Sequence, residues 1–230
     1  MWASAVTGLR HTRRKGTIAM IEVKCGPKTI DLPFMIQIYD VTEEMFDELV
    51  DEDTKAELID GVMIVHSPAS MEHDHIGGFL RGLMSFYADA KGLGVILGPD
   101  SLIHLAPSRK CAPDVFFIRR ERVPAPLPKE FAGVPDLVVE VLSPSNRRYD
   151  LHEKRLIYRE AGVPEIWFID AEFRQVIADR RGPTGYSEEV MAVGRMASSA
   201  LPGFWIETSW LWATPLPSRL LCLQEILRES

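Results

Sequence analysis

The chain has 230 residues, of which 46% are hydrophobic and 26% charged, and its formal net charge is −7. This length and apolar content suit one sizeable α/β domain and exclude a largely disordered chain. Three widely spaced cysteines form neither a disulfide framework nor a CxxC metal site, and they favour a reducing, cytoplasmic location. No run approaches the roughly 18 consecutive apolar residues of a membrane span, so no membrane partner is expected.

The N-terminal segment differs from the rest of the chain. Residues 1–19 contain four basic residues and no acidic one, and they lack the apolar stretch of a secretory signal. We expect residues 1–33 to be a basic, poorly ordered extension and residues 34–230 to form the folded domain. An alternative for the first residues is that translation starts at Met20.

The charge distribution bears on the class of partner. Beyond the N-terminal segment the chain is acidic, which disfavours a nucleic-acid partner unless basic side chains gather locally, because phosphate contacts need positive charge. Basic residues do gather at 119–122, 147–148 and 154–159. Each cluster is either a surface for phosphate groups or an ordinary solvated face.

The first predicted elements are a short helix and a β-hairpin. Thr42 is a suitable N-cap for a helix that ends near Asp51, and acidic residues in its first turn complement the helix dipole. The dipeptide Asp60-Gly61 then separates two apolar runs in the sequence AELIDGVMIVH. Because this dipeptide accepts the positive φ angles of a tight turn, it predicts a hairpin.

A long helix and two strands follow. Ser70 is the predicted N-cap of this helix, and Gly92 with Gly94 is expected to end it. Strands are predicted at 101–106 and 112–119, and the proline-rich stretch 123–135 is predicted to be a loop. The apolar residues of the helix recur at helical spacing: Ile76, Phe79, Leu80, Leu83, Met84 and Tyr87.

The second half of the chain alternates strands and helices. Residues 136–142, DLVVEVL, are apolar on both faces, as in a buried central strand. Asp150 and Glu153 form a D-x-x-E capping box for a helix that ends at Gly162. The order of elements indicates one mixed α/β domain. The remaining predicted elements are strands at 165–170, 174–180 and 185–194, a tryptophan-rich segment at 201–212 and a helix from about 218.

Glu140 is the first candidate site residue, because it interrupts a strand that is otherwise apolar on both faces. A buried carboxylate needs a cation or a raised pKa, so Glu140 either belongs to a functional site or forms a salt bridge near the strand end. Asp114 lies at the start of the strand predicted at 112–119. If the two strands are neighbours, their alternation allows the two carboxylates to meet at one site.

Glu57 and His73 are weaker candidates. Glu57 begins the first hairpin strand and points either toward the same site or outward to solvent. His73, Asp74 and His75 resemble a metal cluster, but adjacent residues on a helix point in different directions. The alternative for these three is a solvated first turn of the long helix, and His73 is retained as an accessory residue.

Five segments, taken in order, resemble the Uma-type restriction endonuclease family of the PD-(D/E)XK nuclease superfamily. The resemblance covers about residues 40–212 and implies a restriction-endonuclease-like fold, with a mixed central sheet flanked by helices. It also implies that Glu57, Asp114 and Glu140 bind a divalent metal. The segments are ELIDG (57–61), APDVFFI (112–118), DLVVEVLSPSN (136–146), D-x-x-x-K (150–154) and AGVPEIWFID (161–170).

The resemblance further implies a catalytic lysine, and here the sequence departs from the superfamily pattern. In E-x-K the lysine stands two residues after the glutamate, where this chain has Leu142. The family is similar to members in which the lysine has moved to the next helix, which makes Lys154 the candidate. Tyr158 lies one turn further on the same helical face and is an accessory residue. The alternative for Lys154 is an exposed lysine that pairs with Asp150.

These residues indicate metal-assisted hydrolysis. Carboxylate oxygens are the ligands that Mg²⁺ and Mn²⁺ prefer, and these ions activate water and bind phosphate. We therefore expect a Mg²⁺- or Mn²⁺-dependent endonuclease that hydrolyses phosphodiester bonds of DNA. One alternative is a catalytically inactive nuclease-fold module for nucleic-acid binding or assembly, and another is a metal-independent hydrolase with two carboxylates. Trp205, Trp210 and Trp212 either line a homodimer surface or belong to the core.

Overall fold

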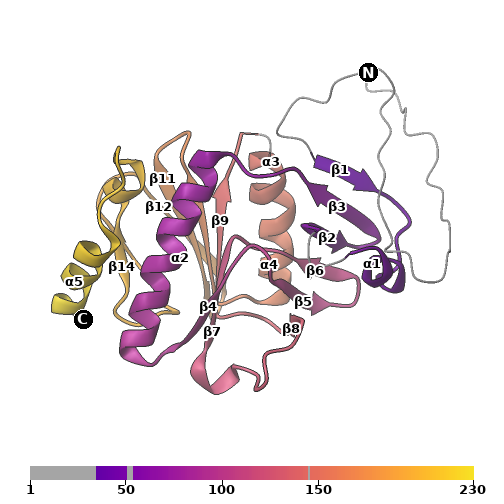
Figure 1. The fold of residues 1–230 in the computed structure, drawn as a ribbon, viewed down its shortest axis with the longest axis horizontal. Coiled ribbons are helices and arrows are strands. Elements are labelled where there is room, and N and C mark those ends of the chain that lie inside the picture. Colours follow the sequence, from indigo (N-terminus) through magenta and orange to yellow (C-terminus); the bar gives the residue numbers. More distant parts are fainter. Residues whose placement is uncertain (1–34, 51–53, 145) are drawn as a thin grey trace.

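Two six-stranded sheets form the framework of the protein in this computed structural model, which describes residues 35–50, 54–144 and 146–230. The expected N-terminal extension lies outside the described residues, as does the domain boundary at residue 34. Figure 1 shows the two sheets side by side, with the first sheet next to the short helix α1 (Glu43–Leu49) and the second sheet next to the long helix α2 (Met71–Lys91).

The first sheet has the strand order β1-β3-β2-β6-β5-β8. The hairpin predicted around Asp60-Gly61 is confirmed, because β2 and β3 pair antiparallel across this turn. Strand β8 lies inside the stretch predicted to be a loop, where it pairs in parallel with β5 and buries Phe131. The strands are β1 (Met35–Ile38), β3 (Val62–His66), β2 (Ala56–Ile59), β6 (Arg109–Cys111), β5 (Leu102–Ala106) and β8 (Glu130–Ala132).

The second sheet has the order β12-β11-β10-β9-β7-β4 and carries the buried strand predicted at 136–142. That strand, β9, pairs antiparallel with β7 and parallel with β10, so it is central as expected. The strands are β12 (Gly185–Met191), β11 (Gln175–Gly182), β10 (Glu165–Asp170), β9 (Leu137–Leu142), β7 (Val115–Arg119) and β4 (Gly94–Leu97).

Helices cover both faces of the second sheet. Helix α2, with Ser70 as its N-cap and left-handed Gly92 at its end, packs with the C-terminal helix α5 (Arg219–Glu229) over one face. Helix α4 (Arg155–Ala161) lies over the other face (Figure 1). Short elements complete the chain: the 3-10 turns Arg120–Arg122 and Thr208–Trp212, and the two-stranded sheet of β13 (Arg195–Ala197) and β14 (Trp205–Glu207).

Alternation along β9 separates two apolar cores. Val139 and Val141 face α2, whereas Val138 and Leu142 face α4 together with Phe116 of β7. Because side chains alternate along a strand, Glu140 lies on the α4 face among apolar neighbours. The fold therefore places this carboxylate between the second sheet and the helical segment that follows β9.

The predicted capping box at Asp150 is wrong. The helical segment begins earlier, with α3 (Arg147–Tyr149), and passes through a π-helical turn (Asp150–Lys154) into α4. The backbone N–H of Asp150 donates to the carbonyl of Asn146, so Asp150 lies inside the helix rather than at its start. Its side chain is buried and Glu153 is exposed, which rules out the reciprocal contacts of a capping box.

The tryptophan-rich segment belongs to the core. Trp205 is buried, and Trp210 and Trp212 are half-buried against the core on the α2 side. The rings of Trp205 and Trp210 have centroids 5.3 Å apart. The core alternative for these residues is confirmed, while the homodimer stays a prediction. No helix in the described part of the chain is long and apolar enough to cross a membrane.

The basic clusters of the sequence are largely engaged in ion pairs within the chain. Arg119 and Arg122 pair with Asp136 at 3.2 and 3.0 Å, and Arg147 pairs with Asp170 at 2.9 Å. These arginines hold loops and helix starts against strand ends. They therefore stabilise the fold rather than offer free positive charge to phosphate groups.

Asp179 anchors the helix that carries the candidate site. This fully buried carboxylate on β11 accepts hydrogen bonds from Arg155 at 2.5 Å and from Arg159 at 2.6 Å. Burial raises the pKa of Asp179, but the two arginines outweigh that influence and leave the pKa below its usual value. The ion pair therefore fixes α4 against strand β11 of the second sheet.

Asp179→Asn is expected to lower the free energy of unfolding by about 3 kcal/mol, because it leaves two partly buried guanidinium groups without their partner. The lowered pKa predicts that this contribution is fully present above the unfolded-state pKa and is lost as the pH falls below about 4. Urea unfolding at pH 7 and pH 3 measures both effects. The exposed Asp89→Asn is the control, and an equal stability difference at both pH values would contradict the prediction.

Candidate active site

Asp114 and Glu140 lie on neighbouring strands. Strands β7 and β9 pair antiparallel with Val115 opposite Val139, so Asp114, just before β7, lies beside Glu140. The backbone N–H of Val141 donates to Asp114 Oδ2 at 2.9 Å. The strand adjacency on which their meeting depends is confirmed. Both carboxylates are almost completely buried, with 7% and 2% exposure.

Glu140 is held by two donors from the following helical segment. Tyr158 Oη donates to Glu140 Oε1 at 2.6 Å, and Lys154 Nζ donates to the same oxygen at 3.1 Å. Burial raises the pKa of Glu140, and the nearby carboxylates of Asp114 and Glu57 act in the same direction. The lysine and the tyrosine only partly offset these influences, so the pKa remains above its usual value.

Lys154 forms a buried bridge between two strands. Its Nζ lies 2.9 Å from Glu57 Oε1 and 3.1 Å from Glu140 Oε1, and its third neighbour is Asp150 at 3.8 Å. Burial lowers the pKa of Lys154, but Glu140, Glu57 and Asp150 outweigh it and raise the pKa well above its usual value. The ammonium approaches Glu140 as the sequence predicts, and the exposed-lysine alternative is wrong.

The π-helical turn explains how Lys154 reaches both carboxylates. A π turn widens the helix by one residue, and such turns are frequent at functional sites. Here it buries both ends of the D-x-x-x-K segment, Asp150 and Lys154, on the side that faces the sheets. Burial and the surrounding carboxylates raise the pKa of Asp150 well above its usual value, although Lys154 opposes them.

Glu57 is turned inward, and both of its oxygens have partners. Oε1 accepts from the backbone N–H of Ala112 at 2.8 Å and from Lys154, while Oε2 lies 2.8 Å from His66 Nε2. Burial raises its pKa, but Lys154, His66 and the Ala112 amide outweigh burial and lower the pKa to about 2. The outward-pointing alternative for Glu57 is wrong, and its contacts are those of a residue that fixes Lys154.

Asp114 faces two cationic side chains. His73 Nε2 lies 3.1 Å from Oδ2, and Lys55 Nζ donates to Oδ1 at 3.3 Å. Burial raises the pKa of Asp114, but His73, Lys55 and the more distant Lys154 outweigh burial and leave the pKa well below its usual value. The same contact raises the pKa of His73 against the opposing effect of burial. Within the cluster His73-Asp74-His75, only His73 reaches the site, and the other two are exposed.

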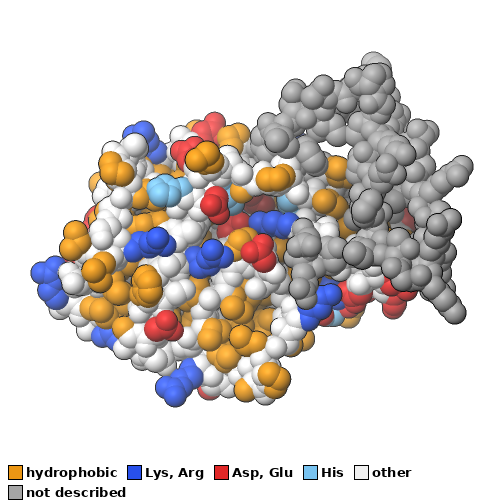
Figure 2. Space-filling view, in the orientation of Figure 1, with side chains coloured by type: hydrophobic (Ala, Val, Ile, Leu, Met, Phe, Trp, Pro, Cys, Tyr) orange, Lys and Arg blue, Asp and Glu red, His pale blue; other side chains and the backbone are white. Residues whose placement is uncertain are grey.

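The site lies near the start of α2, because His73 in the first turn of this helix contacts Asp114. Figure 2 shows acidic and histidine side chains close together beside α2. Glu57 comes from the first sheet, Asp114 and Glu140 come from the second, and Lys154 comes from the helical segment. The site is therefore built where the two sheets and α4 meet.

The donor set fits a hard divalent cation only in part. Asp114 and Glu140 supply carboxylate oxygens side by side, and one or two carboxylates completed by water and substrate phosphate suit Mg²⁺. In the part of the chain that the structure describes, no group of three or more His, Cys, Asp or Glu residues could hold a metal ion. The geometry thus favours a two-carboxylate centre, and a ligand role for Glu57 stays a prediction.

Three residues of the site were not anticipated. His66 ends β3. It lies two residues after Ile64, which pairs with Glu57, so His66 is on the same face of the hairpin and diagonally across from Glu57. A polar residue at this position is the local sequence feature that could have identified it. Lys55 stands two residues before Glu57, so alternation along an extended chain places the two side chains on the same face. This K-x-E spacing could have identified Lys55 as a site residue. Tyr149 is buried with its ring centroid 5.9 Å from Lys154 Nζ, and its hydroxyl has no hydrogen-bond partner among the described residues. Nothing local in the sequence distinguishes Tyr149.

Comparisons with known proteins bear on the family and the fold of the chain. Residues 43–209, more than half of the chain, match the family model Uma2, described as "Putative restriction endonuclease". A solved structure from Anabaena variabilis ATCC 29413, described as "a putative nuclease belonging to DUF820", is similar with a TM-score of 0.67 at 17% sequence identity. The match covers 75% of this chain and 97% of that one, and it shows the likeness of the folds. No curated protein matches the chain.

Proposed function

The chain belongs to the Uma2 family, whose model is described as "Putative restriction endonuclease", and from this premise we propose that it is a Mg²⁺- or Mn²⁺-dependent endonuclease that hydrolyses phosphodiester bonds of DNA. The observation that carries the proposal is the buried Lys154 ammonium, which lies 3.1 Å from Glu140, while Glu140 lies beside Asp114 on the paired strands β7 and β9. A lysine beside two adjoining carboxylates is the constellation expected of a phosphodiester-cleaving centre that uses a metal.

Asp114 and Glu140 would hold the metal, with Glu57 as the possible third ligand. When bound, a divalent cation polarises the phosphoryl group and lowers the pKa of a coordinated water. Tyr158 fixes Glu140 Oε1, which leaves Oε2 directed away from that hydrogen bond. Val141 and His73 fix Asp114 Oδ2, so the oxygen toward Lys55 is the more available one. The chain thus orients one oxygen of each carboxylate.

Lys154 supplies fixed positive charge next to the reacting phosphate. Glu57 and Glu140 hold its ammonium from two sides, so its position is set before substrate binds. A preorganised cation in a water-poor site stabilises the extra negative charge that develops on phosphate oxygens in the transition state. His66 and the Ala112 amide hold Glu57 in turn, which makes Glu57 and His66 positioning residues for Lys154.

The free cysteines bear on where in the cell the protein is located. Cys111 and Cys222 are free and buried among the described residues, which fits the proposed cytoplasmic location. A homodimer would supply a second copy of the site for the opposite strand of a duplex, and it is proposed on that ground alone.

Removal of divalent cations is expected to abolish cleavage and to leave the fold intact. EDTA added to the full-length chain with supercoiled DNA should stop nicking, and excess Mg²⁺ or Mn²⁺ should restore it, because the carboxylates need a cation to engage phosphate. Gel electrophoresis follows the reaction and circular dichroism follows the fold. Nicking that continues in EDTA would favour the metal-independent hydrolase. Binding in a mobility-shift assay without any cleavage would favour the inactive module.

A further inference from the structure

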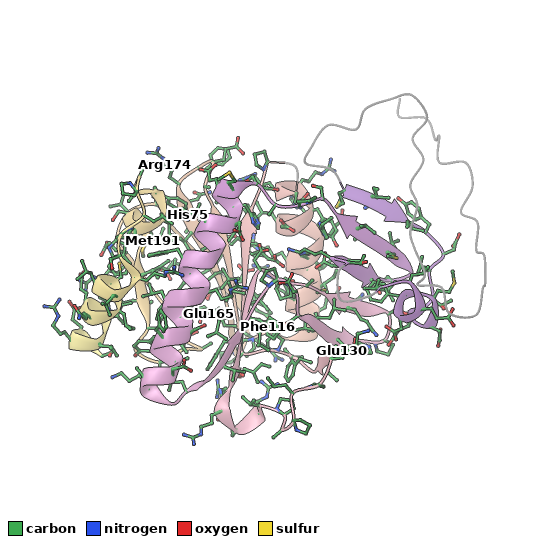
Figure 3. The ribbon with its side chains drawn as sticks, in the orientation of Figure 1. His75, Phe116, Glu130, Glu165, Arg174 and Met191 are labelled. Atoms are coloured by element: carbon green, nitrogen blue, oxygen red, sulfur yellow. The ribbon has the colours of Figure 1, made fainter. Side chains whose placement is uncertain are left out.

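A cavity of about 420 Å³ opens beside the candidate active site, between α1 and the first sheet. Its volume falls within the range of small-molecule binding pockets. Figure 3 labels Glu130, one of its lining residues, at the end of the molecule that carries the first sheet, away from Glu165 near α2. The site described above does not use this cavity.

The inner wall of the cavity is shared with the active site. Lys55 lines the cavity, and its Nζ contacts Asp114 Oδ1 at 3.3 Å. Ala112 lines it as well, while its backbone N–H donates to Glu57. Since Ala112 precedes Asp114 by two residues, their Cα atoms are less than about 8 Å apart. A ligand in the cavity would therefore reach the carboxylate centre through Lys55.

One lysine on the inner wall of the cavity and one exposed lysine supply positive charge that a ligand can reach. Lys110 is buried and is already neutralised by Asp47 at 2.6 Å and Glu130 at 3.1 Å. The Lys55 side chain pairs with Asp114 at 3.3 Å but remains 32% exposed, and Lys129 is exposed with no ion pair to any residue that the structure describes. These two side chains are the ones that remain able to contact an anionic group.

Two carboxylates in the cavity retain hydrogen-bond acceptors. Asp47 Oδ1 accepts a hydrogen bond from Lys110, and Oδ2 has no hydrogen bond or ion pair with the described residues. Asp100 is exposed and likewise has no partner within the described ranges. A carboxylate only accepts hydrogen bonds, so it selects ligands that present N–H or O–H donors. The cavity thus combines two cations with acceptors on its wall.

We propose that this cavity binds one nucleotide of the substrate strand next to the scissile phosphate, an inference that rests on the proposed function. Lys55 and Lys129 contact the phosphates on either side of the nucleotide, and Asp47 with Asp100 accepts hydrogen bonds from the base. The exocyclic amino group of cytosine or adenine offers two N–H donors, whereas thymine presents an acceptor oxygen in that place. A base held in this way is unstacked, so the substrate is a single-stranded or unpaired segment.

The first test measures binding without chemistry. The full-length protein is titrated in EDTA with dCMP and with dTMP up to millimolar concentrations, and binding is followed by ligand-observed NMR. The wild type should bind dCMP more tightly than dTMP. Lys129→Gln should weaken both by about tenfold, the value of one charge-assisted hydrogen bond. Asp100→Asn should weaken dCMP alone and remove the preference.

Two controls match these variants. Lys91→Gln and Asp89→Asn change exposed residues on α2 that lie outside the cavity, and both should bind as the wild type does. Absence of nucleotide binding to the wild type, or affinities unchanged by Lys129→Gln, would overturn the proposal. Equal weakening by Lys91→Gln would show general charge attraction only and would overturn it as well.

A second test separates this inference from the proposed function. On a short single-stranded substrate with Mg²⁺, Lys129→Gln should raise KM and leave kcat unchanged, because the lysine binds ground state and transition state alike. If the wild type shows metal-dependent cleavage but does not bind nucleotides, the nucleotide-binding proposal is overturned and the nuclease proposal stands. If nucleotides bind and the Lys129 and Asp100 variants behave as expected, but no DNA is cleaved, the nuclease proposal is overturned and the cavity remains a nucleotide-binding site.

Discussion

Lys154→Met is expected to reduce the rate of DNA cleavage by about 10²–10³-fold, the usual effect of removing one preorganised charge-stabilising donor. Methionine keeps the volume of the lysine stem and removes only the ammonium that lies 2.9 Å from Glu57 and 3.1 Å from Glu140. Lys154→Arg is expected to restore little activity, because a planar guanidinium does not fit the space of a compact ammonium between two carboxylates.

The same substitution is expected to lower stability, because it leaves two buried carboxylates without their cation. The loss of a partner from a buried ion pair costs about 3–5 kcal/mol. Cleavage must therefore be measured at a temperature where circular dichroism shows Lys154→Met to be folded, with rates expressed per folded molecule. A folded Lys154→Met that cleaves at the wild-type rate would show that the lysine in this helix has no part in the chemistry.

Glu140→Gln is expected to lower cleavage by at least about a thousandfold, since the carboxylate and the cation it holds together contribute several kcal/mol to transition-state stabilisation. The amide keeps the shape of the side chain, and its oxygen still accepts from Tyr158. Loss of activity would therefore report the missing negative charge rather than a collapsed core. Single-turnover cleavage with excess enzyme measures the chemical step.

Glu165→Gln is the matched control for this prediction. Glu165 is also fully buried in the second sheet, on the neighbouring strand β10 (Figure 3). Its oxygens accept from Trp167, Arg180 and Ser198, so its role is to hold the segment that begins at Ser198. Glu165→Gln should reduce stability and leave cleavage per folded molecule unchanged. Equal losses of activity in the two variants would indicate a structural role for Glu140.

Local patterns predicted much of the framework. The apolar run on both faces of DLVVEVL marked the central strand and the polar Glu140 within it, and Asp60-Gly61 marked the hairpin that carries Glu57. These features follow from interactions over a few residues. The pairing of β8 with β5 and the contact of the Ala112 amide with Glu57 depend on which strands far apart in the chain become neighbours, which short-range patterns do not encode.

The error at Asp150 has a physical origin. D-x-x-E is a frequent start of a helix, and the preceding serines and asparagine look like a turn. In the folded chain the helix starts at Arg147, and the buried carboxylate of Asp150 lies 3.8 Å from the Lys154 ammonium. A buried ammonium without carboxylate neighbours is strongly destabilising, and this cost outweighs the local preference of Asp150 for a capping position. The segment Asp150–Lys154 therefore belongs to the site rather than to the start of the helix.

The measurement that tests the central claim most directly is cleavage of supercoiled and single-stranded DNA by the wild type and by Asp114→Ala, each with Mg²⁺ or Mn²⁺ and with EDTA. Asp114 lies beside Glu140 and does not contact Lys154 directly, so its removal should leave Lys154 in place and still prevent metal-assisted attack. We predict nicked or fragmented DNA for the wild type with metal, and intact DNA for Asp114→Ala and for all samples with EDTA. Equal cleavage by the wild type and Asp114→Ala, or intact DNA for the wild type with either metal, would contradict the account.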